Sequence, residues 1–238
     1  MRFGKEGLVL LLLLSAFLTA AGCVPKSYRA HPDLALHLKD IKTHGLVPPD
    51  IKVYEFTAGG VHELRDDWCD IGRQNTAKAV AEELKERSMG VKAIPVDKEI
   101  ETELEEIQAL YRAVSLSIQW HTYGPFLFPE KQKNFDYSLG PVKHLLQKNG
   151  ADTLLFIDGF DEISTGGRKA LIVVGLLTGI VPRSGVTAMS SAVVDTEGKI
   201  LWYNVKGSQA QHDLRNYDSV CRLVDSLLAD LPKAGSGR

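Results

Sequence analysis

The sequence carries almost no net charge and no long basic stretch, and these two absences narrow the possible partners. Its 28 lysines and arginines nearly balance its 30 aspartates and glutamates, which gives a formal net charge of -2. Nucleic-acid binding relies on a positive surface that faces the phosphates, so this distribution argues against a DNA- or RNA-binding protein. Internal similarity with a period of about 20 to 50 residues is also lacking, which argues against a repeat array.

Motifs of catalysis and of metal binding are absent as well. The seven histidines are scattered, and none lies four residues from another. No cysteine or histidine lies at ligand spacing from Cys69 or Cys221, so no metal site is predicted. The Gly-x-Ser-x-Gly turn of many serine hydrolases and the Walker phosphate loop are both missing. We therefore predict a non-enzymatic protein without a metal or another cofactor.

What the chain does have, at its start, is the pattern of a secretory signal. The basic residues Arg2 and Lys5 precede an apolar run over residues 8–18, and small residues follow from Thr19 onward. The apolar run is shorter than the ~20 residues that a membrane-spanning helix needs. We predict that residues 1–22 are a signal peptide.

The residues around Cys23 make this prediction more specific. The sequence Ala20-Ala21-Gly22-Cys23 resembles the lipobox, the processing site of bacterial lipoproteins. The resemblance implies lipidation of Cys23, whose two or more acyl chains would hold the protein durably at a membrane. Val24 follows where some lipoproteins have aspartate, and by resemblance to sorting in enteric bacteria this implies the outer membrane, with the domain facing the periplasm. The alternative is a secreted protein whose Cys23 is unmodified.

The mature chain is predicted to consist of a tether followed by one domain. We interpret the proline-punctuated residues 23–47 as the lipidated cysteine and its tether, residues 48–232 as an α/β domain, and residues 233–238 as a disordered tail. Cys69 and Cys221 fall on predicted helices, where they form either a disulfide or two separate buried thiols.

Apolar periodicity predicts helices that alternate with strands. Apolar side chains spaced by three and four residues predict one long helix over residues 97–121 and another over residues 216–231. The near-continuous apolar run Thr153–Asp158 is typical of a central strand. Further predicted elements are a helix over residues 66–87, strands over residues 51–56 and 91–96, and a hairpin over residues 185–205. This order predicts an α/β fold with a mixed β-sheet and flanking helices, in two or three layers.

Three segments of the predicted domain are informative together: Pro48–Val53, Gly150–Phe156 and Val193–Trp202. They resemble a group of bacterial envelope lipoproteins whose α/β domain is related to the amino-terminal domain of TolB and to CsgG. In the third segment a strand ends in Val-Asp, a glycine-containing turn follows, and the next strand begins Ile-Leu-Trp. The resemblance implies an α/β fold and a place in the cell envelope, and it transfers no catalytic residue.

Three carboxylates follow the predicted central strand, at Asp158, Asp161 and Glu162. Ligands often bind where the strands of an α/β sheet end, so these residues are our predicted ligand-binding site. The alternative is an ordinary solvated loop. The next residues, Thr165–Lys169, either form a flexible turn or present glycine N–H groups to an anion.

The most unusual segment of the predicted domain is Ala170–Val181, with the sequence ALIVVGLLTGIV. It is too short to cross a bilayer as a helix, so it is either a core element or a surface that meets a membrane or a partner subunit. In the second case Val174 and Leu177 are the predicted partner contacts. Gly175 and Gly179 are four residues apart, which would permit close approach of another helix.

Taken together, these patterns predict a lipid-anchored accessory or structural lipoprotein of a bacterial envelope assembly. It would act through contacts with envelope proteins or with further copies of itself. The alternative function is small-ligand binding by a lipoprotein that faces the periplasm, at the strand end near Asp158.

Overall fold

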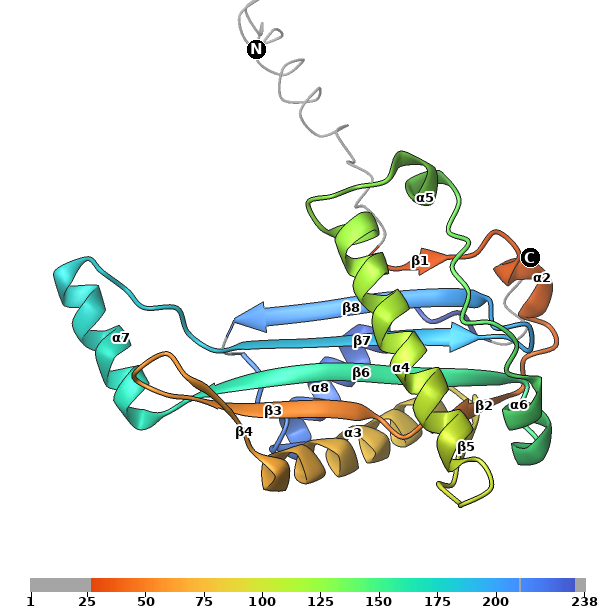
Figure 1. The fold of residues 1–238 in the computed structure, drawn as a ribbon, viewed down its shortest axis with the longest axis horizontal. Coiled ribbons are helices and arrows are strands. Elements are labelled where there is room, and N and C mark those ends of the chain that lie inside the picture. The colour runs from red at the N-terminus through yellow and green to blue at the C-terminus, as the bar shows by residue number, and fades with distance from the viewer. Residues whose placement is uncertain (1–26, 210, 234–238) are drawn as a thin grey trace, which may run out of the picture.

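A mixed eight-stranded sheet forms the middle of the molecule (Figure 1). The computed structural model describes residues 27–209 and 211–233, so the predicted signal peptide, Cys23 and most of the predicted tail lie outside the described residues. The strands are β1 (Arg29–Ala30), β2 (Thr43–Leu46), β3 (Asp50–Phe56), β4 (His62–Leu64), β5 (Gly90–Ala93), β6 (Thr153–Ser164), β7 (Val186–Val194) and β8 (Ile200–Gln209). Their order across the sheet is β1-β8-β7-β6-β2-β5; in addition, β3 pairs with the second half of β6, and β4 pairs with the outer edge of β3.

The central strand, β6, is twice as long as its apolar run suggested. One of its edges pairs with β7, antiparallel, whereas the other edge pairs in succession with β2 and β3, both parallel. Pro48 and Pro49 separate β2 from β3, because proline has no N–H to donate to the neighbouring strand. The backbone N–H of Val47 still donates to the carbonyl of Leu155, at 3.0 Å.

Helices cover both faces of this sheet, which confirms the predicted fold class. The helices are α2 (Leu34–His37), α3 (Asp66–Glu86), α4 (Glu101–Ile118), the π-helix η1 (Gln119–Tyr123), α5 (Pro129–Lys133), α6 (Lys143–Asn149), α7 (Gly166–Thr178) and α8 (Tyr217–Leu228). In Figure 1, α4 crosses the sheet in front, while α3 and α8 lie behind it. None of the described helices combines the length and apolar character needed to cross a membrane.

Each face of the sheet has its own apolar core. The core shared with α3 and α8 includes Leu84, Trp202 and Val224, all buried. The core under α4 includes Phe156 and Tyr111, whose rings stack with centroids 4.6 Å apart. The apolar stripes of α4 and α8 thus face the sheet, as their spacing predicted.

The domain begins earlier than predicted, since residues 29–30 and 43–46 already form strands of the sheet. β1 pairs with β8, and β2 lies between β6 and β5, so the predicted tether over residues 23–47 is wrong for this part. β2 has the sequence THGL, in which His44 and Gly45 replace the apolar run of an ordinary buried strand. A Cβ on Gly45 would lie 2.8 Å from Cδ1 of Ile94, so a larger residue there would require that side chain to shift.

The two cysteines of the described chain are separate free thiols and form no disulfide. Cys69 is buried and Cys221 is half-buried. The sulfur of Cys69 accepts a hydrogen bond from the backbone N–H of Val53, at 3.1 Å. Of the two alternatives, the structure therefore has unpaired thiols, one of them fully buried.

Candidate functional site

The three predicted ligand carboxylates lie within β6 and not in a loop after it. Successive residues of a strand point to opposite faces, so Asp158 and Glu162 lie on the face that α4 covers and Asp161 on the other. The structure therefore does not bring Asp158, Asp161 and Glu162 together into one site. Each has different surroundings and has to be considered separately.

Asp161 is buried and fixes the segment that leads into α8. Its carboxylate accepts hydrogen bonds from the hydroxyl of Thr187, at 2.7 Å, and from the backbone N–H of Leu214, at 2.9 Å. Burial raises the pKa of Asp161, although these two hydrogen bonds oppose the rise. With both oxygens occupied by the protein itself, this side chain has a structural role.

Glu162 is also occupied, at the base of α7. Its carboxylate lies 3.0 Å from the guanidinium of Arg183 and 3.3 Å from the ring of His62. It also accepts a hydrogen bond from the backbone N–H of Val186, at 3.2 Å. Glu162 therefore links the end of β6 to the segment that follows α7, through its contacts with Arg183 and Val186.

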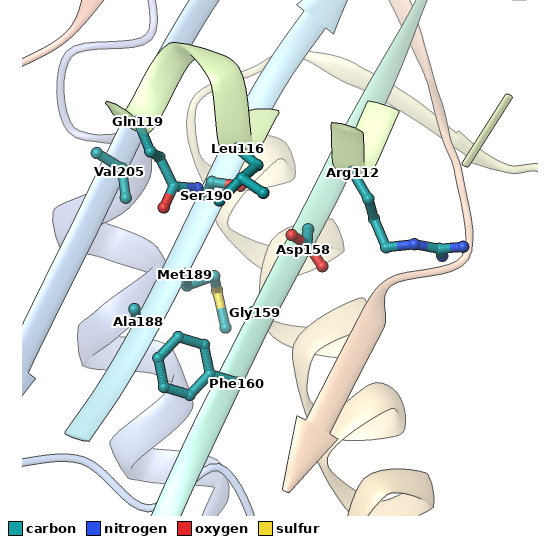
Figure 2. Close-up of a pocket in the computed structure, with 10 residues that line it drawn as sticks. All are labelled: Arg112, Leu116, Gln119, Asp158, Gly159, Phe160, Ala188, Met189, Ser190 and Val205. Carbon is teal, nitrogen blue, oxygen red and sulfur yellow. The ribbon is translucent and has the colours of Figure 1, made fainter. Parts of the chain in front are cut away.

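Asp158 alone faces an open pocket, of about 270 Å³, between α4 and the sheet. Figure 2 shows the carboxylate of Asp158 below α4, with Arg112 extended away from it. The guanidinium of Arg112 donates to Asp50 at 2.6 Å, and Lys52 also pairs with Asp50, at 3.3 Å. The pocket is lined by residues from five elements, α4, η1, β6, β7 and β8: Arg112, Leu116, Gln119, Asp158, Gly159, Phe160, Ala188, Met189, Ser190 and Val205.

The surroundings of Asp158 favour its protonated form. Burial, followed by the charge of Asp50 directly across in register on β3, raises its pKa to about 6. Nearby, the hydroxyl of Ser190 lies 3.1 Å from that of Tyr111 and 3.2 Å from that of Ser115, within a buried hydroxyl cluster. The pocket thus offers one acid that titrates near pH 6 beside hydroxyl groups and apolar walls.

Replacing Asp158 with asparagine is expected to stabilise the fold at pH 8. The pKa of about 6 in the folded chain exceeds the ordinary 3.8, so ionisation of Asp158 opposes folding. The cost is complete above pH 6 and disappears as the pH falls through 6 toward 3.8. We expect the free energy of unfolding to rise by about 1 to 2 kcal/mol at pH 8 and by much less at pH 4.5.

Urea unfolding at the two pH values measures this difference. The matched control is Glu105→Gln, which removes an exposed carboxylate from α4, the helix that covers the pocket, and should change little at either pH. An equal gain from Asp158→Asn at both pH values, or a loss at pH 8, would contradict the assigned cause.

The segment Ala170–Val181 forms most of α7 and is not part of the core. The hydroxyl of Thr165 accepts a hydrogen bond from the N–H of Arg168, so residues 165–169 begin a helix and are not a flexible turn. In Figure 1, α7 stands beyond the end of the sheet, between β6 and β7. We call the exposed apolar side chains of α7 and of the two residues after its C-cap the α7 surface: Leu171, Val173, Val174, Leu176, Leu177, Ile180 and Val181. Val174 is 54% exposed and Leu177 is 85% exposed.

Gly175 and Gly179 allow the protein's own backbone to pack and turn at the end of α7. A Cβ on Gly175 would lie 2.4 Å from the carbonyl oxygen of Ile180, so Gly175 gives room to the segment that returns to the sheet. Gly179 has a φ of 81° and ends the helix in the left-handed conformation. The segment after α7 therefore covers Gly175, so another helix cannot approach α7 closely at that residue.

A buried arginine fixes the base of α7. The guanidinium of Arg168 lies 3.4 Å from the centroid of the Phe56 ring. It donates to the carbonyl of Arg183, at 2.6 and 3.0 Å, and to the carbonyl of Thr57, at 3.2 Å. The sequence showed Arg168 only as a charge beside an apolar run. The helix is thus held firmly at one end while the α7 surface faces solvent.

The described residues contain no group of three His, Cys, Asp or Glu side chains that could hold a metal ion. The two candidate functional sites of the described residues are therefore the Asp158 pocket and the α7 surface. Comparison of the chain with protein-family models, curated proteins and solved structures gives no match.

Proposed function

We propose that the chain is a lipid-anchored, non-enzymatic accessory or structural lipoprotein of a bacterial envelope assembly, and that it acts through protein contacts of the α7 surface. The observation that carries the proposal is this run of exposed apolar side chains on a helix whose base is fixed. Monomeric proteins seldom expose a contiguous apolar patch of this kind unless it meets a partner.

The arrangement of α7 favours binding on energetic grounds. Full burial of one valine or leucine side chain contributes about 1.5 to 3 kcal/mol, and several such side chains lie together on α7. Because Arg168 already holds the helix in place, little of this gain is lost to ordering α7 on association.

The proposed location comes from the N-terminal sequence. The lipobox-like residues before Cys23 support lipidation of that cysteine, and Val24 supports an outer-membrane anchor with the domain facing the periplasm. The resemblance to envelope lipoproteins with a TolB-like or CsgG-like domain supports the same compartment.

Charges placed on the α7 surface are expected to abolish the assembly without unfolding the domain. In the acylated full-length protein in mild detergent, Val174→Glu with Leu177→Glu should reduce the mass measured by light scattering from a multimer or complex to a monomer. Both side chains are more than half exposed, so we expect the thermal midpoint to stay within a few degrees of wild type.

The control is Leu36→Glu, which places one glutamate at another exposed leucine, on α2, and it is compared with Leu177→Glu alone as well as with the double variant. It should leave the mass unchanged. A wild-type protein that is monomeric, and whose residue 174 yields no crosslinked neighbour in cells when a photo-crosslinker replaces it, would overturn the proposed contact.

The Asp158 pocket supports a second candidate function, the binding of a small ligand. A carboxylate among apolar walls and hydroxyl groups suits an amine with an apolar chain. A primary alkylamine that raises the thermal midpoint of the wild type at pH 8, but not that of Asp158→Asn, would favour this function.

A further inference from the structure

A second group of exposed apolar side chains lies where α4 ends. We call residues 120–128, which comprise most of η1 and the segment after it, the aromatic loop. Trp120 is 49% exposed, and Phe126, Leu127 and Phe128 are each more than half exposed.

The aromatic loop is held in one conformation by its own contacts. The rings of Trp120 and Phe126 stack 5.4 Å apart, and those of His121 and Phe128 stack 4.1 Å apart. The N–H of Phe128 donates to the carbonyl of His121, at 3.0 Å. Gly124 allows the tight turn, since a Cβ there would lie 2.8 Å from the carbonyl oxygen of Gln119. These side chains are therefore displayed on an ordered turn.

The aromatic loop lies close to the point where the domain meets its N-terminal segment. The guanidinium of Arg29, in β1, lies 5.2 Å from the centroid of the Tyr123 ring, in η1. Figure 1 shows β1 beside the C-terminal end of α4. Arg29 is six residues after Cys23, and six residues span at most about 20 Å even when fully extended. A lipid on Cys23 would therefore hold a membrane within about 20 Å of Arg29.

We propose that the aromatic loop lies against the lipid surface to which Cys23 is anchored, with Trp120 at the level of the headgroups. Indole rings favour that position because they combine an apolar body with a polar N–H group. A short tether also gives the loop a high effective concentration at the bilayer, so that a weak affinity suffices. This inference rests on the proposed lipid anchor and adds a second, noncovalent contact with the same membrane.

Fluorescence quenching by brominated lipids tests the contact. The acylated full-length protein would be placed in vesicles of phosphatidylethanolamine and phosphatidylglycerol, with and without bromine on the acyl chains. Of the three tryptophans, Trp202 is buried, and the Trp68 ring contacts the guanidinium groups of Arg65 and Arg215, which lie 4.4 and 4.2 Å from its centroid. We therefore expect brominated lipid to quench Trp120 selectively, and Trp120→Phe to abolish the quenching.

A charged variant and a matched control complete the test. Phe126→Asp with Leu127→Asp should reduce the quenching of Trp120 by removing the apolar contact, whereas Val174→Glu with Leu177→Glu on the α7 surface should leave it unchanged. Acylated protein that binds the vesicles without any quenching of Trp120 would overturn this inference and leave the anchor standing. An unacylated Cys23 in the mature native protein would overturn both.

Discussion

Exchanging Cys23 for serine, behind a leader that is cleaved without lipidation, is expected to release the protein from the membrane completely. Each buried CH2 group of an acyl chain contributes about 0.8 kcal/mol, so the loss of two or more chains removes far more binding free energy than the aromatic loop could supply. Phase separation in Triton X-114, followed by immunoblotting, should find the wild type in the detergent phase and the variant in the aqueous phase.

Cysteines elsewhere in the chain provide the controls. Cys69→Ser and Cys221→Ser, each behind the native leader, should stay in the detergent phase, because neither residue follows a lipobox-like sequence. Mass spectrometry of the mature N-terminus gives the direct measurement. A native protein with a bare Cys23, or one that stays in the aqueous phase, would contradict the lipid anchor and with it the proposed location.

The parts of the fold that could be predicted are those with a long, regular apolar pattern. α4 and α8 each lie on one face of the sheet, so their buried positions recur every three or four residues along the chain. The hairpin of β7 and β8 was visible from its glycine-containing turn, where Gly198 has a φ of 78°. These elements can be recognised from the sequence because each packs against a single surface, so its buried positions follow one regular spacing.

The parts that were missed depend on contacts between distant segments. β2 is short, contains a histidine and a glycine, and becomes a buried strand because β5 and β6 lie on both sides of it. The four residues of β2 by themselves carry no pattern that predicts a buried strand at this position in the sheet. β6 continues past Asp158 for the same reason, since pairing with β3 and β7 stabilises the polar residues of its second half in an extended conformation.

The candidate site shows the same limitation. The three carboxylates were predicted to form one site because they are close in sequence. In the structure, however, β6 includes all three residues, and Asp161 lies on the opposite face from Asp158. The features that distinguish the Asp158 pocket come from α4, β3 and β7, through Arg112, Asp50 and Ser190. The apolar character of α7 was evident in the sequence, whereas its exposure follows from its position beyond the sheet.

Replacing Trp202 with alanine is expected to have the largest effect on stability. The side chain is fully buried between the sheet and the helices behind it, and truncation of a buried tryptophan costs about 3 to 5 kcal/mol. Trp202→Phe should cost no more than about 2 kcal/mol, because it keeps most of the packing and removes an indole N–H that has no hydrogen-bond partner among the described residues. Urea denaturation at neutral pH measures both changes.

Comparing the stability loss of Trp202→Ala with that of Leu177→Ala tests whether the α7 surface contributes to folding or is available for binding. Leu177 is as apolar as a core residue but 85% exposed, so its truncation should change the free energy of unfolding by less than about 0.5 kcal/mol. If Leu177→Ala costs as much as a core substitution, α7 packs within the domain and the proposed contact surface does not exist. If only Trp202→Ala is costly, the core behind the sheet stabilises the fold and α7 does not. The apolar side chains of α7 then contribute almost nothing to folding, and about 1.5 to 3 kcal/mol for each one fully buried remains available for binding a partner.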